Sequence, residues 1–167
     1  MKLRVFLLTL FLGCVQIIAS AATDGLQPQA VVDLIKRIAG EKGAEKFVFV
    51  LEGTITADES ERFTIASSQG KVQIKGNSIS AITTGLGWYL NNYANVNIAW
   101  NALNEKAEGE PYVKLSHLPL PEQEETRSSD ARYRYFFNYC TFGYSMTTWT
   151  WKRWQQEIDW MALHGIN

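Results

Sequence analysis

Residues 133–167 have the sequence YRYFFNYCTFGYSMTTWTWKRWQQEIDWMALHGIN, and this stretch decides the fold. Residues 133–140 are rich in aromatic side chains, which is typical of a β-strand. Large apolar residues then recur at intervals of three or four, at Trp151, Trp154, Ile158 and Met161. That spacing predicts an amphipathic helix, which Gly165 ends before Ile166 begins a further strand. Strand, loop, helix and strand together make one βα unit of a parallel sheet.

The apolar stripe of this helix needs more strands to cover it, because a helix of an α/β fold buries that stripe against a sheet. We therefore expect a truncated sequence, with residues 132–167 as the start of a larger domain. The leading candidate for that domain is a (β/α)8 TIM barrel, and a doubly wound sheet is the alternative. The expected fold class is α/β.

Residues 22–102 are expected to form a small N-terminal α/β domain. Its expected elements are a helix within 27–46, a strand at 47–51, a hairpin of strands at 62–66 and 71–75, a helix at 79–90 and a strand at 96–100. Because residues 47–51 are continuously apolar, that strand should be buried. Ser78 is the expected N-cap of the second helix. Gly85 and Gly87 in the same helix indicate close packing against the sheet.

Residues 103–131 are predicted to form a linker between the two domains. This segment is rich in glutamate and contains prolines, which stiffen a connecting chain. An acidic run is usually a solvated stretch, so no catalytic role is assigned to it.

Residues 1–21 have the pattern of a secretory signal peptide: two basic residues, a short apolar run and a small-residue cleavage site. The pattern predicts export to the periplasm or the extracellular space. Lipid anchoring at Cys14 is the less favoured alternative. No second apolar run of that length follows, so no transmembrane segment is expected in the mature chain.

Charge and cysteine content exclude several classes of function. The chain has 16 Lys+Arg against 17 Asp+Glu, a net charge of -1, so it lacks the basic excess of a nucleic-acid-binding protein. Once Cys14 leaves with the signal peptide, Cys140 is the remaining cysteine, which excludes an intrachain disulfide and a thiolate metal site. No metal or other cofactor is expected, and the sequence does not indicate an oligomeric state.

The barrel interpretation points to three candidate ligand-binding residues. Active sites of such barrels lie at the C-terminal ends of the strands. Asn138 and Cys140 fall at that end on one face of the expected strand, and Tyr144 falls in the loop that follows. An amide and an aromatic ring suit a small polar ligand such as a sugar.

Each of these residues also has a structural interpretation. Asn138 could satisfy buried backbone groups, Cys140 could be a small buried hydrophobe, and Tyr144 could anchor a loop. Among the tryptophans, Trp149 is a candidate for ligand contact because it precedes the helix. Glu157 and Asp159 lie two positions apart on an outer helix and point away from each other, which favours a solvated face or salt bridges over catalysis.

The stretch 132–167, with its run EIDWMALHGIN, resembles the α-N-acetylglucosaminidase family, glycoside hydrolase family 89. Residues 25–100 resemble the small N-terminal domain of that family through their element order and the pattern Gly85-Leu86-x-x-Tyr89-Leu90. The resemblance implies a catalytic (β/α)8 barrel after an α/β domain. It also implies that Asn138, Cys140 and Tyr144 line a sugar pocket and that a glycan with terminal N-acetylglucosamine is the binding partner.

The implied activity is exo-acting, retaining hydrolysis of terminal α-linked N-acetylglucosamine. In this family the two catalytic glutamates come from later barrel strands, so no catalytic residue is nominated here. The 167 residues alone are accordingly expected to be inactive, whereas a full-length product should be active. The alternatives are a standalone carbohydrate-binding or interaction module, and another sugar-cleaving barrel such as a β-hexosaminidase or an α-glucuronidase.

Overall fold

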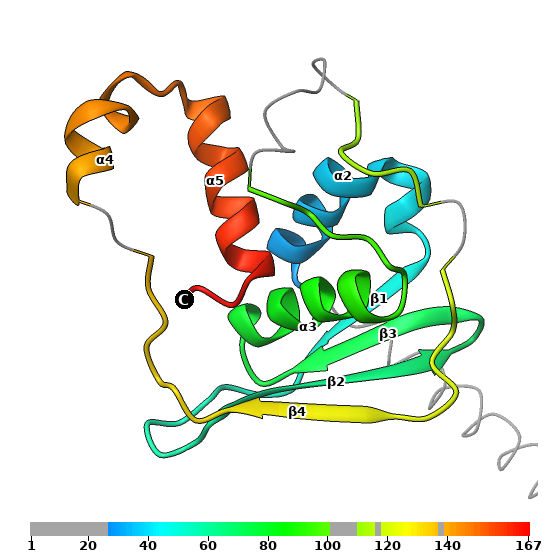
Figure 1. Cartoon of the computed structure of the whole chain (residues 1–167). Coiled ribbons are helices and arrows are strands. Elements are labelled where there is room, and N and C mark those ends of the chain that lie inside the picture. The colour runs from blue at the N-terminus through cyan, green and yellow to red at the C-terminus, as the bar shows by residue number, and fades with distance from the viewer. Residues whose placement is uncertain (1–26, 101–109, 116–117, 137–138) are drawn as a thin grey trace, which may run out of the picture.

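The computed structural model describes residues 27–100, 110–115, 118–136 and 139–167. In these residues a four-stranded sheet carries helices on one of its sides (Figure 1). The elements are α2 (Gln29–Ala44), β1 (Phe47–Leu51), β2 (Glu61–Ser68), β3 (Lys71–Gly76), α3 (Ile79–Asn92), β4 (Glu125–Ser129), α4 (Tyr139–Tyr144), the 3-10 helix η2 (Met146–Thr148) and α5 (Trp151–Leu163). The mixed α/β class expected from the sequence is confirmed.

The sheet has the strand order β1-β3-β2-β4, with β1 parallel to β3 and the other pairs antiparallel. The expected β2–β3 hairpin is confirmed. It turns at Gln69 and Gly70, both at positive φ, which is the backbone that a tight two-residue hairpin turn requires. The β1–β3 crossover therefore leaves β1 at one edge of the sheet and β4 at the other.

The core lies between the sheet and the helices α2 and α3. Alternate strand residues point into it, at Phe47, Phe49, Phe63, Ile65, Val72 and Ile74. The expectation of a wholly buried strand at 47–51 is wrong, because β1 is an edge strand that buries one face and leaves Leu51 exposed. The N-cap prediction for α3 is confirmed, since the backbone N–H of Ala81 donates to Ser78 Oγ at 2.9 Å.

The fourth strand lies in the segment that the sequence predicted to be a linker. β4 pairs with β2 from Glu61↔Ser129 to Ile65↔Glu125. The strand expected at 96–100 does not form. After α3 the chain makes a turn through Asn95, which has a positive φ, and Ile98 packs into the core as irregular structure.

Helix α3 is packed on two sides. A Cβ on Gly85 would come within 3.0 Å of the Phe63 ring, so the expected packing of this glycine against the sheet is confirmed. Gly87 instead faces α5, where a Cβ would lie 1.9 Å from the carbonyl oxygen of Leu163. The prediction that Gly87 packs against the sheet is therefore wrong. The missing side chain of Gly87 lets the C-terminal helix approach α3 closely.

The predicted C-terminal helix is confirmed as α5, which Thr150 caps by accepting from the backbone N–H of Arg153. The strand expected at 133–140 is not seen among the described residues: 132–136 have no regular structure and α4 begins at Tyr139. A strand needs a hydrogen-bonded neighbour along its length. Among the described residues, one backbone hydrogen bond joins 132–136 to 165–167: the N–H of Asn167 donates to the carbonyl oxygen of Arg134 at 2.9 Å.

Candidate functional site

The three predicted sugar-site residues are not brought together in one described cavity. Asn138 lies outside the described residues. Cys140 is an exposed free thiol on α4, and Tyr144 at the end of that helix is 86% exposed. Neither of the two lines any of the three cavities given below. The assignment of these residues to a ligand site therefore stays a prediction.

Large aromatic side chains of the C-terminal segment face outward. They are Tyr133, Tyr135, Phe136, Tyr144 and Trp151. Ile158 of the apolar stripe on α5 is also exposed. The N-terminal domain thus contacts the other side of α5 and leaves part of this stripe uncovered.

Trp149, the other candidate for ligand contact, is half-buried among its neighbours. The guanidinium carbon of Arg153 lies 3.9 Å from the centre of its ring, and the ring of Trp154 meets it edge-on at 5.2 Å. One ring face of Trp149 is therefore used by a cation–π contact within the chain.

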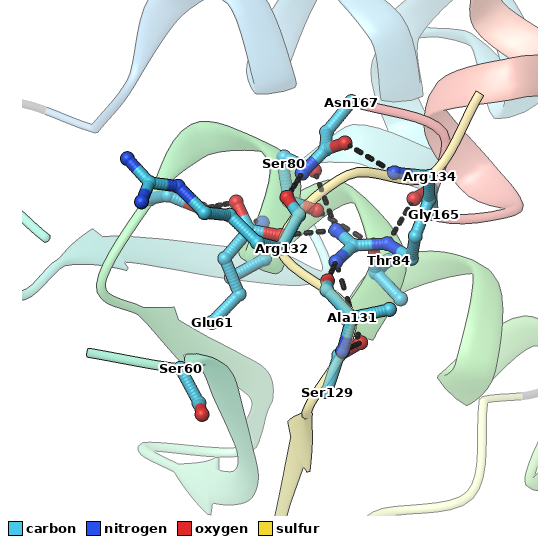
Figure 2. A network of polar contacts seen from close by, with 12 residues as sticks. Ser60, Glu61, Ser80, Thr84, Ser129, Ala131, Arg132, Arg134, Gly165 and Asn167 are labelled. Atoms are coloured by element: carbon cyan, nitrogen blue, oxygen red, sulfur yellow. Dashed lines mark hydrogen bonds and ion pairs between the residues drawn. The ribbon is translucent and has the colours of Figure 1, made fainter. Parts of the chain in front are cut away.

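In the described residues, the polar group with the most hydrogen bonds lies where the N-terminal domain meets residues 132–167. Figure 2 shows the guanidinium of Arg134 at its centre. Its Nε donates to the carbonyl oxygen of Gly165, one terminal nitrogen donates to Ser129 Oγ and the Ala131 carbonyl, and the other donates to Ser80 Oγ and the carboxylate of Glu61.

Glu61 is itself held from two sides. Its second oxygen accepts from Ser78 Oγ at 2.6 Å, the same hydroxyl that caps α3. Burial raises the pKa of Glu61, but the hydrogen bonds from Ser78 and Arg134 and the charge of Arg134 outweigh it, so the net pKa lies below the ordinary value. The carboxylate is therefore ionised at neutral pH and forms a part-buried ion pair with Arg134.

Asn167 completes this junction through its backbone and side chain. Its Oδ1 accepts from the backbone N–H of Arg134 at 2.9 Å, and its Nδ2 donates to the Arg132 carbonyl at 3.0 Å. An asparagine side chain offers one acceptor and two donors, so it can bridge an unpaired stretch of backbone in this way. The segments around 132–134 and 165–167 are thereby held side by side.

The two acidic residues of α5 are buried in ion pairs. Asp159 is 2% exposed and accepts two 2.7 Å hydrogen bonds from Arg37 of α2. Burial raises the pKa of Asp159 above its ordinary value, although the hydrogen bonds and charge of Arg37 oppose the rise. The hydrogen bond to Asp159 raises the pKa of Arg37. The bidentate geometry indicates that both groups carry their charge.

Glu157 is 1% exposed and accepts from Trp100 Nε1 at 2.7 and 2.8 Å and from Arg153 at 3.0 Å. Like Asp159, it faces away from solvent and toward the N-terminal domain. The salt-bridge interpretation of these two residues is confirmed, and the solvated-face interpretation is wrong. No local pattern in the sequence pointed to Trp100 as a partner of Glu157.

In the described part of the chain, two cavities are lined in part by Glu61 of the junction with Arg134, and another lies beside helix α3. One of about 310 Å³ is lined by Trp88, Asn91, Asn97 and His164, among others. A second, of about 660 Å³, lies over the loop 55–61 beside Arg132 and Tyr133, and a third, of about 290 Å³, lies between Trp88 and Arg134. In the described part of the chain no three His, Cys, Asp or Glu side chains gather as a metal site, and no helix is long and apolar enough to cross a bilayer.

Comparison with protein families gives two matches in chain order. Residues 29–111 match the model of the alpha-N-acetylglucosaminidase (NAGLU) N-terminal domain. Residues 134–167 match the model of the alpha-N-acetylglucosaminidase (NAGLU) tim-barrel domain. Human alpha-N-acetylglucosaminidase is 31% identical over 150 residues, which are 89% of this chain and 19% of the human protein.

Two solved structures of a family 89 glycoside hydrolase from Clostridium perfringens have the same arrangement. One, in complex with its substrate GlcNAc-alpha-1,4-galactose, matches with a TM-score of 0.71 and 26% identity. Another, in complex with PUGNAc, matches with a TM-score of 0.70 and 27% identity. Each match covers 83% of this chain and 15% of the clostridial chain, so the present chain spans less than a fifth of these relatives.

Proposed function

The chain belongs to the alpha-N-acetylglucosaminidase family, and from this premise we propose that it is the N-terminal part of an exported, exo-acting retaining glycoside hydrolase. The proposed reaction is removal of terminal α-linked N-acetylglucosamine from glycans. The observation that carries the proposal is the order of the two matched domains of one family, an α/β domain followed by the start of its barrel.

The exposed aromatic and apolar side chains of residues 133–158 support a continuation of the barrel. Trp151 is 70% exposed and Ile158 is 45% exposed, although both belong to the apolar stripe of α5. Leaving such side chains in water forgoes roughly 25 cal/mol for each Å² of apolar surface. Further βα units of the longer protein would cover this stripe.

In the proposed enzyme Asn138, Cys140 and Tyr144 bind the sugar. The amide of Asn138 would hydrogen-bond an acetamido or hydroxyl group, and the ring of Tyr144 would contact a sugar face. The accessibility of Cys140 and Tyr144 in the present structure is compatible with contact to a ligand.

The proposed retaining mechanism needs two carboxyl groups about 5–5.5 Å apart, one as nucleophile and one as acid/base. Glu157 and Asp159 do not supply this pair, because each is buried in an ion pair with an arginine. The catalytic carboxylates are accordingly proposed to come from barrel strands that follow residue 167 in the longer protein.

Export is proposed from the signal-peptide pattern of residues 1–21. Cleavage after Ala21 would release the mature protein into the periplasm or the extracellular space. Retention of a lipidated Cys14 at the N-terminus of the mature protein would instead favour a membrane-anchored lipoprotein.

Hydrolysis of an aryl α-N-acetylglucosaminide tests the proposal. The longer gene product is expected to release the aryl group, whereas the 167-residue chain is expected to give no turnover because it lacks the catalytic carboxylates. The matched control is the β-linked aryl glycoside, which an enzyme specific for the α-linkage leaves intact. Turnover by the 167 residues, or cleavage of the β-linked compound alone, would contradict the proposed function.

A further inference from the structure

All five N–H donors of the Arg134 guanidinium have a partner. Nε has one partner and each terminal nitrogen has two, and the acceptors are Gly165 O, Ser129 Oγ, Ala131 O, Ser80 Oγ and Glu61 Oε2. An arginine has five such donors in total, so this one has no hydrogen-bonding capacity left for a ligand. Its side chain serves the internal structure of the protein.

The partners come from separate parts of the fold. Glu61 begins β2, Ser80 lies in the first turn of α3, and Ser129 ends β4. Gly165 follows α5, within the segment that matches the barrel. The single planar group of Arg134 therefore joins three elements of the N-terminal sheet and helix layer to Gly165 at the end of the barrel segment.

The ion pair with Glu61 is sheltered from water. The side chain of Arg134 is 19% exposed and that of Glu61 is 13% exposed. At this burial the attraction is screened less than on a surface, and the planar fork of the guanidinium fixes direction as well as distance. Lysine would keep the charge but could make at most three hydrogen bonds, without that fixed geometry.

Little else holds the backbone at this point. Residues 132–136 have no regular secondary structure, and their backbone bonds to Asn167 rather than to a strand ladder. Cys140, one of the residues proposed to contact the sugar, follows Arg134 by six residues along the chain. A shift of residue 134 would therefore change where the chain enters that part of the proposed site.

We propose that Arg134 is a positioning residue, which fixes the start of the barrel segment on the N-terminal domain and so sets the position of the chain that leads to Cys140 in the sugar site. This inference rests on the proposed function. It gives the N-terminal α/β domain a part in the activity, because Glu61, Ser80 and Ser129 then serve as the fixed points from which the sugar site is built.

The test uses the longer gene product with the aryl α-N-acetylglucosaminide, and measures kcat/KM and Tm for each variant. Arg134→Lys is the main variant. Arg37→Lys is its matched control, because Arg37 makes the same type of ion pair between the two segments but holds α5 through Asp159. Glu61→Gln is a milder variant, which removes the charge and keeps an oxygen acceptor at the same place.

The inference predicts that Arg134→Lys lowers kcat/KM by about 10- to 100-fold at temperatures well below Tm, the size of effect that a misplacement of about 1 Å produces. Glu61→Gln should give a smaller loss in the same direction. Arg37→Lys should lower Tm but keep the kcat/KM of the wild type. If Arg134→Lys does not fold, the inference is tested by Glu61→Gln and Arg37→Lys, of which Glu61→Gln alone should lower kcat/KM.

An Arg134→Lys or Glu61→Gln enzyme with wild-type kcat/KM would overturn the inference and leave the proposed function intact. The same would follow if Arg37→Lys lost as much activity as Arg134→Lys for an equal fall in Tm, because the loss would then reflect stability alone. An inactive wild-type enzyme would overturn the proposed function, and the positioning role with it.

Discussion

At the scale of single residues, arginine–carboxylate pairs carry much of the contact between the N-terminal domain and the C-terminal segment. Arg134 bonds to Glu61 and Arg37 bonds to Asp159, across sequence separations of 73 and 122 residues. Removing one partner of such a pair leaves the other charge buried without compensation. This destabilises a protein more than replacing both partners by apolar residues does. These pairs therefore favour one docked arrangement of the two segments.

The lowered pKa of Glu61 makes one of these pairs sensitive to acid. A carboxyl whose folded pKa is depressed stabilises the fold above its unfolded pKa, and that contribution is lost as the pH falls through the folded pKa. Stability of the wild-type chain should therefore decline as the pH drops below 4.5, the ordinary pKa of a glutamate. Glu61→Gln should lower stability at pH 7 and weaken this decline, as measured by urea unfolding across the acid range.

Equal pH dependence of unfolding in the wild type and Glu61→Gln would contradict this account of the carboxylate. Glu59→Gln is a suitable control, because its carboxylate is fully exposed and bonds to the backbone of its own loop at Thr56. Its pKa is also lowered, through that local bond, so Glu59→Gln should itself weaken the acid-induced decline while it leaves the junction with Arg134 intact. The junction is therefore read from the loss of stability at pH 7 that Glu61→Gln shows beyond that of Glu59→Gln.

At the scale of elements, the sequence predicted those with a strong period or a clear turn. The helices α2, α3 and α5 and the β2–β3 hairpin follow from apolar spacing, the Ser78 cap and the Gln69-Gly70 turn. β4 was missed because its residues are ETRSS, with no apolar face to detect. Its place in the sheet comes from backbone pairing to β2 and from polar contacts such as Tyr93 to Glu125 at 2.5 Å.

The strand at 96–100 was predicted from β-branched and aromatic residues, but in the structure these residues make tertiary contacts without forming a strand. Ile98 fills the core, and Trp100 reaches across to Glu157 of α5. The aromatic composition of 133–140 likewise favours a strand, but composition supplies no hydrogen-bonding partner. Local sequence could not show the ion-paired junction either, because Arg134 and its partner Glu61 lie far apart along the chain.

The contact between α3 and α5 gives a prediction about a single glycine. In Gly87→Ala the new methyl group would meet the backbone of Leu163, which can yield only if α5 moves. Overpacking of this kind costs roughly 1–3 kcal/mol, so thermal unfolding should show a clear fall in Tm. Gly143→Ala is the control, because no atom lies within 4 Å of the added Cβ. Equal Tm values for the two variants would show that α5 does not pack on α3 as described.

At the scale of the whole molecule, α5 has two different sides. One side docks on the N-terminal domain through Asp159, Glu157 and Leu163, which are buried. The other leaves Trp151 and Ile158 exposed. The apolar stripe expected from the sequence thus exists. The sequence alone did not show that the side of the helix that carries Glu157 and Asp159 packs on the N-terminal domain.

The candidate sugar site was predictable only as a pattern. The spacing of Asn138, Cys140 and Tyr144 and the family resemblance singled out these residues, and the domain matches support the family. The chain spans 19% of the human protein, so the remainder of the barrel domain is not part of the described residues. That these side chains contact one ligand therefore stays a prediction.

A crystal structure of the longer protein with bound N-acetylglucosamine tests the central claim most directly. The claim predicts a (β/α)8 barrel that begins near residue 132, with the side chains of Asn138, Cys140 and Tyr144 in contact with the sugar. A structure in which Asn138 and Cys140 point away from the sugar-binding cavity, or in which residues 132–167 belong to no barrel, would contradict it.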